Sequence, residues 1–530
     1  MFAGCESGPA DVLQAEPDFA TINLSTSSVV MSAEGGQKTL FIGTNRTELE
    51  TLKDADWLDV GLDGSGLTLF VEPNTTGQSR LAVVDVVAGE QPDVAKTRLK
   101  VVQKGELTHN LSEAGRANCY IAQTEGSYCF DASVRGNGAG DGNSNYIDTY
   151  GVEIQGASYA DLAWEATYDG DKTRSTKIIS GEVVYVPEDG CIYFSTGESE
   201  GNALVTLRNA AGEILWSWHL WVVNEKITTS WANGVEWMDR NLGALNNNEG
   251  DIANRGMLYQ WGRKEPFLPS PVEYVAMPKH RYDENYNLLE SEEEYYAVQD
   301  EIEAARVIMN VNNEQTGDGL MEWSFVGDVA PVALKAPGNI DYALQHPTTV
   351  LSCRSDIAIG EYVFDWFLVM DLEGSGVTMQ QADSQLWGTA NEGTNYKTIF
   401  DPCPAGYVVP PKGAFTELPD GYACSYVSDE WEASENGWVW SGGNGDYFPS
   451  SGNLDVSGLI GETGEKLLYW TAESMGSGVE GFGKAATLFV AYNDVFYGVY
   501  PLMDPAEGAS WYSYGARCYA ASVRCVKEQK

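Results

Sequence analysis

Residues 67–71 read LTLFV, and the alternation in this short segment indicates the fold class of the first part of the chain. Leu67, Leu69 and Val71 occupy every second position, as one face of a half-buried strand requires. Similar segments surround it: INLSTSSVVM, KTLFIGTN, WLDVGLD, RLAVVDVVAG and TRLKVVQKG, with turn residues between them. Six or seven short strands in about 85 residues predict an immunoglobulin-like β-sandwich, which we place over residues 21–105.

The following part of the chain continues the β pattern. Residues 202–223 read NALVTLRNAAGEILWSWHLWVV, two segments that are expected to pair as strands. The second segment alternates between two sets of residues: Ile214, Trp216, Trp218, Leu220 and Val222, and Leu215, Ser217, His219 and Trp221. This pattern predicts a strand that is buried on one face and partly covered on the other. Cys119 and Cys129 lie on what looks like a hairpin, where a cross-strand disulfide is one of the open alternatives. Residues 106–225 are therefore predicted to form a second β-sandwich module.

Composition bounds the class of protein and its partners. At 530 residues with 43% hydrophobic content, the chain is long enough for several packed domains. Its 57 Gly, 28 Tyr and 16 Trp favour a β-dominated architecture. The formal net charge of −45 makes a surface that repels phosphate backbones and anionic lipid headgroups. We therefore expect no binding to nucleic acid and no direct binding to a membrane surface.

The first residues indicate an anchor. Phe2 to Cys5 resemble the end of a bacterial lipoprotein signal, in which small residues precede a cysteine that becomes lipidated. Residues 1–20 are thus expected to be a remnant of this signal and a tether. Since no run of 18 apolar residues occurs, a lipid on Cys5 is the expected attachment, to the outer membrane at the cell surface. An ordinary cysteine in a tail is the alternative.

Each of the first two modules resembles a known kind of β-module, the first through three motifs and the second through one segment. The Gly35-Gly36 turn, Trp57 of ADWLDV and the closing LKVVQKG resemble a BACON domain, a family named for carbohydrate-binding proteins of one phylum, the Bacteroidetes. No exposed aromatic row is evident in the module, so Trp57 is expected in the core and the module is interpreted as a spacer. The segment GEILWSWHLWV resembles a β-module of surface and fimbria-associated proteins of the same group.

The C-terminal half, residues 226–530, carries the most specific resemblance. EWMDRNLGAL, GMLYQWGRKEPF, HPTTVL, KTIFDPCPAGYVVP, LYWTAE and SVRCVKE follow one another in this order. Together they resemble the Fibrobacter succinogenes major paralogous domain of surface proteins. The resemblance implies an α+β C-type-lectin-like fold whose first and last strands meet, with a disulfide between Cys403 and Cys525. Cys424 and Cys518 are a second candidate pair. An insertion near 281–306 looks helical and acidic.

Large aromatic residues crowd the segment before Cys525, and the candidate ligand-binding residues lie there. They are Tyr497, Tyr500, Trp511, Tyr512 and Tyr514. Tyr and Trp cover a large apolar area and keep a polar group, which suits a sugar ring or a protein partner. In lectin-like folds the late loops display the ligand surface. The alternative, that these side chains pack the domain's own core, stays open.

Patterns that would indicate catalysis or a cofactor are absent from the sequence. The four histidines have no HExxH or triad context. Residues 478–484 imitate a P-loop, but Ala485 stands where magnesium binding needs Ser or Thr. The loop 135–148 offers oxygen ligands that calcium prefers without the EF-hand spacing. We expect no metal and no cofactor, with calcium in this loop as the weaker alternative to a solvated turn.

The sequence therefore predicts a multidomain, β-dominated protein: two immunoglobulin-like β-sandwich modules followed by an α+β C-type-lectin-like domain. We interpret it as a non-enzymatic cell-surface lipoprotein, an adhesin that binds an extracellular glycan or a host or bacterial surface protein, with pilus subunits among the candidate partners. One alternative is a glycan-capturing lipoprotein of a polysaccharide-uptake system. The other is an enzyme on the related formylglycine-generating fold.

Overall fold

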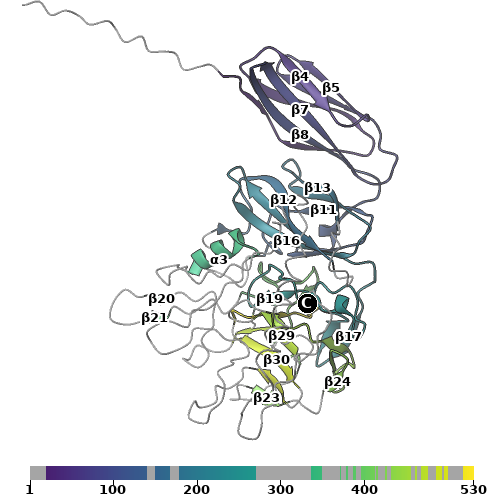
Figure 1. The fold of residues 1–530 in the computed structure, drawn as a ribbon, viewed down its shortest axis with the longest axis vertical. Coiled ribbons are helices and arrows are strands. Elements are labelled where there is room, and N and C mark those ends of the chain that lie inside the picture. The colour runs from purple at the N-terminus through teal and green to yellow at the C-terminus, as the bar shows by residue number, and fades with distance from the viewer. Residues whose placement is uncertain are drawn as a thin grey trace, which may run out of the picture. The chain divides into compact units, whose positions relative to one another are not determined.

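The computed structural model describes residues 19–139, 150–167 and 178–269, then 336–348 and a series of shorter segments between 370 and 529. The chain divides into two compact units, Met1–Glu106 and Leu107–Lys530, which are drawn in Figure 1. The first unit matches the extent expected for the first sandwich. No helix among these described residues is long and apolar enough to cross a membrane.

The first unit consists of two four-stranded sheets. One sheet has the order β1 (Ile22–Leu24), β3 (Gly36–Thr44), β6 (Gly66–Val71), β5 (Leu58–Asp63). The other has the order β2 (Ser28–Met31), β8 (Asp93–Gln103), β7 (Arg80–Glu90), β4 (Leu49–Lys53). Neighbouring strands are antiparallel except β2 and β8, which run parallel.

The alternation in LTLFV has the predicted effect. Leu67, Leu69 and Val71 are buried in the core of the first unit, where apolar residues of both sheets meet. Trp57 lies only partly buried at the edge of this core, with the Arg80 guanidinium 4.3 Å above its ring. Its indole therefore borders the core and stacks on a cation at the surface.

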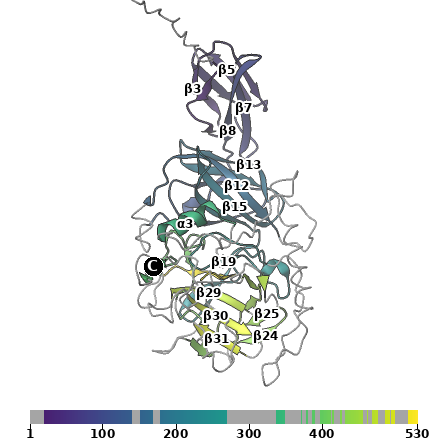
Figure 2. The same cartoon turned by 60° about the vertical axis from the view of Figure 1, so that its left-hand side comes forward.

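The second unit begins with two further four-stranded sheets. One sheet has the order β10 (Cys119–Ala122), β16 (Ile214–Val222), β15 (Gly201–Asn209), β12 (Ala157–Ala166). The other has the order β13 (Ile179–Val186), β14 (Cys191–Thr196), β11 (Ser127–Asp131), β9 (Thr108–Asn110). The expected pairing within 202–223 is the antiparallel pair β15–β16. Figure 2 shows β12, β13 and β15 side by side in this part of the chain.

The predicted hairpin between Cys119 and Cys129 is wrong. β10 pairs in parallel with β16, whereas β11 pairs with β14, so the two cysteines lie in different sheets. Cys119 is buried and takes no part in a disulfide. A turn between two successive strands permits a hairpin but does not require one, and here each strand pairs with a partner far away in sequence.

The described residues between 226 and 529 form four more sheets, one of which is the two-stranded pair β20 (Met370–Asp371) and β21 (Thr378–Met379). Another has the order β17 (Thr229–Ala232), β18 (Val235–Met238), β33 (Val526–Lys527), β22 (Tyr407–Val408). A larger sheet includes β29 (Leu467–Ser474), β30 (Ala485–Ala491), β31 (Asp494–Gly498) and β32 (Ala520–Ser522). A small sheet holds β24 (Glu432–Ser434), β25 (Gly437–Val439) and β26 (Tyr447–Pro449).

The beginning and the end of this region meet. Trp237 of β18 pairs with Val526 of β33. Next to this pair a disulfide joins Cys403 to Cys525, which are 122 residues apart in sequence and both fully buried. The pairing that the family resemblance implied is thus present. Cys518 is buried, and the side chain of Cys424 lies outside the described residues, so the second pairing stays a prediction.

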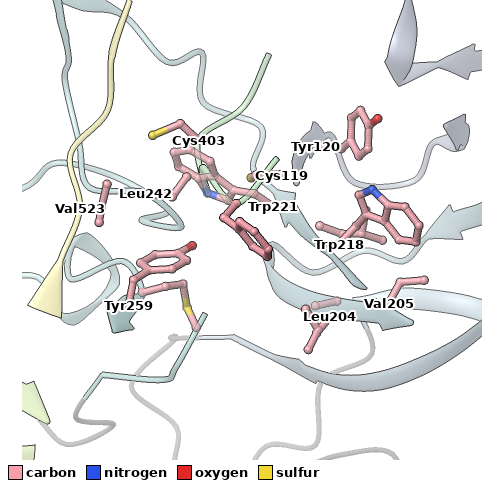
Figure 3. Packing of buried hydrophobic residues seen from close by; sticks show 14 of the residues in the cluster. Cys119, Tyr120, Leu204, Val205, Trp218, Trp221, Leu242, Tyr259, Cys403 and Val523 are labelled. Atoms are coloured by element: carbon pink, nitrogen blue, oxygen red, sulfur yellow. The ribbon is translucent and has the colours of Figure 1, made fainter. Parts of the chain in front are cut away.

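The boundary expected near residue 225 does not separate two compact units. One hydrophobic cluster contains Trp218 and Trp221 from β16 together with Leu242, Tyr259 and Val523 from beyond the boundary, as Figure 3 shows. Polar contacts also cross it. The Asn118 amide donates to the backbone oxygens of residues 399 and 401 at 2.6 and 2.9 Å. Both sides of residue 225 therefore share one core.

The chain is β-dominated, with sheets in both compact units. Its described α-helix, α3 (Ala336–Gln345), packs against β16 and is labelled in Figures 1 and 2. The insertion predicted near 281–306 lies outside the described residues.

Candidate ligand-binding site

The predicted ligand-binding residues fall where the structure describes no side chains. Tyr497 lies in β31, opposite Leu488 of β30 and Ser425. Its side chain lies outside the described residues, as do the whole of Tyr500, Trp511, Tyr512 and Tyr514. The late aromatic segment therefore stays a prediction, and so does lipidation of Cys5, which also lies outside the described residues.

A different aromatic side chain is exposed on the hairpin β17–β18. Asn233 and Gly234 form its turn with φ angles of 46° and 77°, and two successive positive φ angles are what a type I′ turn requires. This turn fixes the register, in which Trp231 lies opposite Glu236 and Ala232 opposite Val235. Trp231 is 67% exposed, the highest value for a large hydrophobic side chain in the described residues.

The inner face of this sheet explains why the hairpin folds. Trp237 is fully buried, and its ring centroid lies 4.7 Å from that of Phe415 and 5.7 Å from that of Trp440. Val408 and Val526 belong to the same cluster. Burial of these apolar side chains removes them from water and supplies the driving force for the sheet.

The outer face carries a row of different character. Because Trp237, Val526 and Val408 pair across the strands on the inner face, their neighbours Glu236, Lys527 and Tyr407 lie on the opposite face. Trp231 lies on that same face, opposite Glu236. We call this row the Trp231 face; it consists of Trp231, Glu236, Lys527 and Tyr407.

The charges of the Trp231 face neutralise one another. The Lys527 ammonium donates to the Glu236 carboxylate at 2.5 Å, and the Thr229 hydroxyl donates to the same oxygen. These hydrogen bonds, that from Lys527 first, lower the pKa of Glu236, and Glu236 raises the pKa of Lys527. Both groups are therefore charged at neutral pH, and the pair contributes no net charge to the face.

The hairpin is held by contacts on both sides. The Ser230 hydroxyl donates to the Asp446 carboxylate at 2.5 Å. The Asn233 side chain donates to the backbone oxygen of Phe415 at 2.6 Å, and that of Gln529 donates to the backbone oxygen of Gly234 at 2.8 Å. A side chain on a hairpin fixed in this way meets a ligand without first having to be ordered.

The first unit, in which the sequence showed no exposed aromatic row, also exposes two aromatic residues on one sheet. Phe41 and Phe70 are 61% and 41% exposed on the outer face of the sheet β1-β3-β6-β5. Between them the hydroxyls of Thr39 and Thr68 are 2.9 Å apart. Asp59 of β5 lies directly opposite Phe70, and its carboxylate accepts from the Lys53 ammonium at 2.6 Å. This surface is a second candidate, and both of its rings are less exposed than that of Trp231.

A group of buried ionisable residues in the second unit, Arg263, Lys264 and Glu265, is closed to ligands. Lys264 donates to the Glu265 carboxylate at 2.6 Å and to the Ser217 backbone oxygen at 3.0 Å, and lies 4.4 Å from the Trp216 ring. Burial raises the pKa of Glu265, but Lys264 and Arg263 outweigh it, so that the net direction is downward. All three charged side chains are at most 3% exposed, which assigns the cluster to the core.

The described residues contain no group of three or more His, Cys, Asp or Glu side chains placed to hold a metal ion. The loop proposed for calcium is described only up to residue 139 and from residue 150. There the buried Arg135 donates to the backbone oxygens of Tyr150, Gly151 and Glu153. Calcium in that loop stays untested.

Comparisons give no family. No family model matches the chain, and no curated protein matches it. A protein from Bacteroides thetaiotaomicron is 21% identical over 19% of this chain and 98% of its own, with a TM-score of 0.14. A titin M10–obscurin-like 1 Ig complex is 12% identical over 16% of this chain and 94% of its own, with a TM-score of 0.13. The Pseudomonas aeruginosa CupB2 chaperone is 11% identical over 38% of this chain and 100% of its own, with a TM-score of 0.18.

Sequence reasoning missed the Trp231 face. The available signal was the Asn-Gly pair at 233–234, which predicts a two-residue turn between two strands. In that register the side chains of Trp231 and Trp237 lie on opposite faces of the hairpin, so only one of them can point into the core.

Proposed function

We propose that this chain is a non-enzymatic cell-surface adhesin that binds an extracellular glycan through the Trp231 face. The observation that carries the proposal is the 67% exposure of Trp231 beside the Glu236–Lys527 pair. An exposed indole stacks on the apolar face of a sugar ring, while a carboxylate and an ammonium exchange hydrogen bonds with its hydroxyls. The face is neutral as a pair, which suits an uncharged ligand.

The finer description of the chain belongs to the same proposal. It comprises a BACON-like sandwich as spacer, a second immunoglobulin-like sandwich, a C-type-lectin-like head, and a lipid on Cys5 at the outer membrane. The two four-stranded sheets of the first unit support the first element. The β18–β33 pairing, which joins the two ends of residues 226–530, and the Cys403–Cys525 disulfide support the third.

The test is binding of the full chain to an array of immobilised glycans. We expect selective binding that falls at least tenfold in Trp231→Ala and stays unchanged in Tyr159→Ala, whose ring is 41% exposed on a different sheet. Urea unfolding of both variants would show that the fold is kept. Binding that survives Trp231→Ala in a folded protein would refute this face as the site.

A second variant separates the two candidate surfaces. The triple change of Trp511, Tyr512 and Tyr514 to Ala removes rings of the late aromatic segment. Loss of glycan binding in this variant, with Trp231→Ala unaffected, would move the site to that segment. A blank array together with binding to host or bacterial cells would indicate a protein ligand. Strong binding of soluble oligosaccharides would favour a role in glycan capture.

A further inference from the structure

Cys129 and Cys191 lie close together in the second unit. Antiparallel pairing of β11 with β14 places Cys129 opposite Tyr193 and Asp131 opposite Cys191. The two cysteines are therefore diagonal neighbours on one face of the sheet, a spacing across which side chains interact.

The side chains of the two cysteines interact. The Cys129 thiol makes a hydrogen bond with the Cys191 sulfur, which is the largest of the causes that raise the pKa of Cys191. The Cys191 thiol in turn contacts the backbone oxygen of Asp189 at 3.6 Å, and the Asp189 carboxylate accepts from the Cys191 backbone N–H at 3.1 Å. Cys191 is the first residue of β14, directly after Gly190 with a φ of 69°. A strand end next to a glycine turn can shift by the small distance that a covalent bond needs.

One cysteine of the pair is accessible to solvent, and the chain also holds another disulfide. Cys129 is 4% exposed, whereas Cys191 is partly exposed, so that one sulfur can meet an external reagent while the other waits beside it. The chain already holds the Cys403–Cys525 disulfide, and structural disulfides persist in oxidising compartments. A chain that acquires one such bond encounters an oxidant able to make another.

We propose that Cys129 and Cys191 form a second disulfide in the mature protein. The oxidant is a disulfide-carrying thiol oxidoreductase. The Cys191 thiolate attacks its disulfide, forming a mixed disulfide and releasing one carrier thiol. The Cys129 thiol then loses its proton and displaces the second carrier sulfur. The Cys129–Cys191 bond forms, two electrons pass to the carrier, and the carrier leaves as a dithiol.

The bond would link β11 to β14 covalently at the end where β14 begins. Because the hydrogen bond between the thiols keeps Cys191 protonated in the folded sheet, and the thiolate is the reactive form, exchange is expected to be faster before the two strands have paired. The bond would then be made during folding and be retained afterwards.

The experiment uses the full chain secreted into an oxidising compartment, unfolded without reductant, and treated with iodoacetamide before digestion. Mass spectrometry is expected to find a linked peptide pair containing Cys129 and Cys191, beside the pair containing Cys403 and Cys525 as internal control. Buried Cys119, which lies in the other sheet, is expected to carry the alkyl group. Alkylation of both Cys129 and Cys191 in a sample where Cys403–Cys525 is linked would overturn the proposal.

Variants separate a specific bond from general oxidation. In Cys191→Ser, Cys129 is expected to become alkylated in full while the Cys403–Cys525 pair is kept. In Cys119→Ala the Cys129–Cys191 peptide pair is expected to persist unchanged. Under native conditions, graded reductant is expected to open the partly exposed Cys129–Cys191 bond before the fully buried one. Linkage of Cys129 to any other cysteine would also overturn the proposal.

Discussion

Removing the Cys403–Cys525 disulfide should destabilise the second unit more than any surface change. The double variant Cys403→Ala, Cys525→Ala opens a loop of 122 residues. Chain entropy for a closed loop of that length corresponds to about 5 kcal/mol of the free energy of unfolding. Both sulfur atoms are fully buried, so their removal adds a smaller cost through lost packing.

Equilibrium unfolding in urea, followed by tryptophan fluorescence, measures this loss. Trp57 is the one tryptophan in the sequence of the first unit, so the signal reports almost entirely on the second. We expect the midpoint of the transition to fall while the dependence on urea stays close to that of the parent, because the surface exposed on unfolding changes little. When both are measured in reductant, the parent protein and the variant should approach the same stability.

A loss below about 1 kcal/mol would refute the reasoning, because the entropic contribution of so long a loop could not then be present. The single variant Cys525→Ala provides the matched control. It breaks the same bond but leaves the Cys403 thiol in place, and its loss should fall within about 1 kcal/mol of that of the double variant. A single variant as stable as the parent would show that the bond does not constrain the unfolded chain.

Three further outcomes are expected. Burial lowers the pKa of His219 from 6.5 to about 3, so the unfolded chain binds the extra proton and stability falls as the pH drops from 6.5 toward 3. In urea titrations, His219→Gln should remove about 2 kcal/mol of this loss between pH 6.5 and 4.5. Lys397→Met leaves the buried Asp401 carboxylate without the ammonium that lies 2.8 Å from it, and should lower the free energy of unfolding by about 3–5 kcal/mol. The control Lys53→Met, at an exposed position, should lower it by about 1 kcal/mol or less. Trp231→Ala should change the free energy of unfolding in urea by no more than about 0.5 kcal/mol. A larger loss would assign the indole of Trp231 to the fold.

The buried imidazole of His219 has an arrangement that suits a neutral ring. The Asn202 amide donates to the Gly243 backbone oxygen at 2.9 Å, so its oxygen faces His219 Nε2 at 2.8 Å and accepts from it. Nδ1 is then the free acceptor and receives the Tyr259 hydroxyl at 3.2 Å. Every polar atom of the ring is used in the neutral form, which is why protonation belongs to the unfolded state.

Local patterns predicted the strands well, because alternation is a property of neighbouring residues. Leu67 and Leu69 are buried as expected, and the β15–β16 pair follows from one continuous segment. The Cys403–Cys525 pair came from the family resemblance, since spacing alone leaves many pairings open.

Long-range choices were not predictable in the same way. Nothing near Cys119 indicates that β10 pairs in parallel with β16, about 100 residues later. The shared core around Trp221 and Leu242 likewise joins two segments, each of which has enough apolar residues in its sequence to suggest a core of its own. A change of composition near residue 225 therefore indicated a boundary that the packing does not follow.

The two tryptophans of the β17–β18 hairpin are the strongest argument for a binding role. Trp237 is fully buried, and its contacts with Phe415 and Trp440 account for its presence by folding alone. Trp231, six residues earlier, faces away from that cluster and is 67% exposed. An exposed indole on a rigid hairpin gains nothing from the core and adds a risk of association. The chain has a net charge of −45, but Trp231 lies beside an ion pair whose charges cancel. This local surface suits an uncharged ligand with an apolar face.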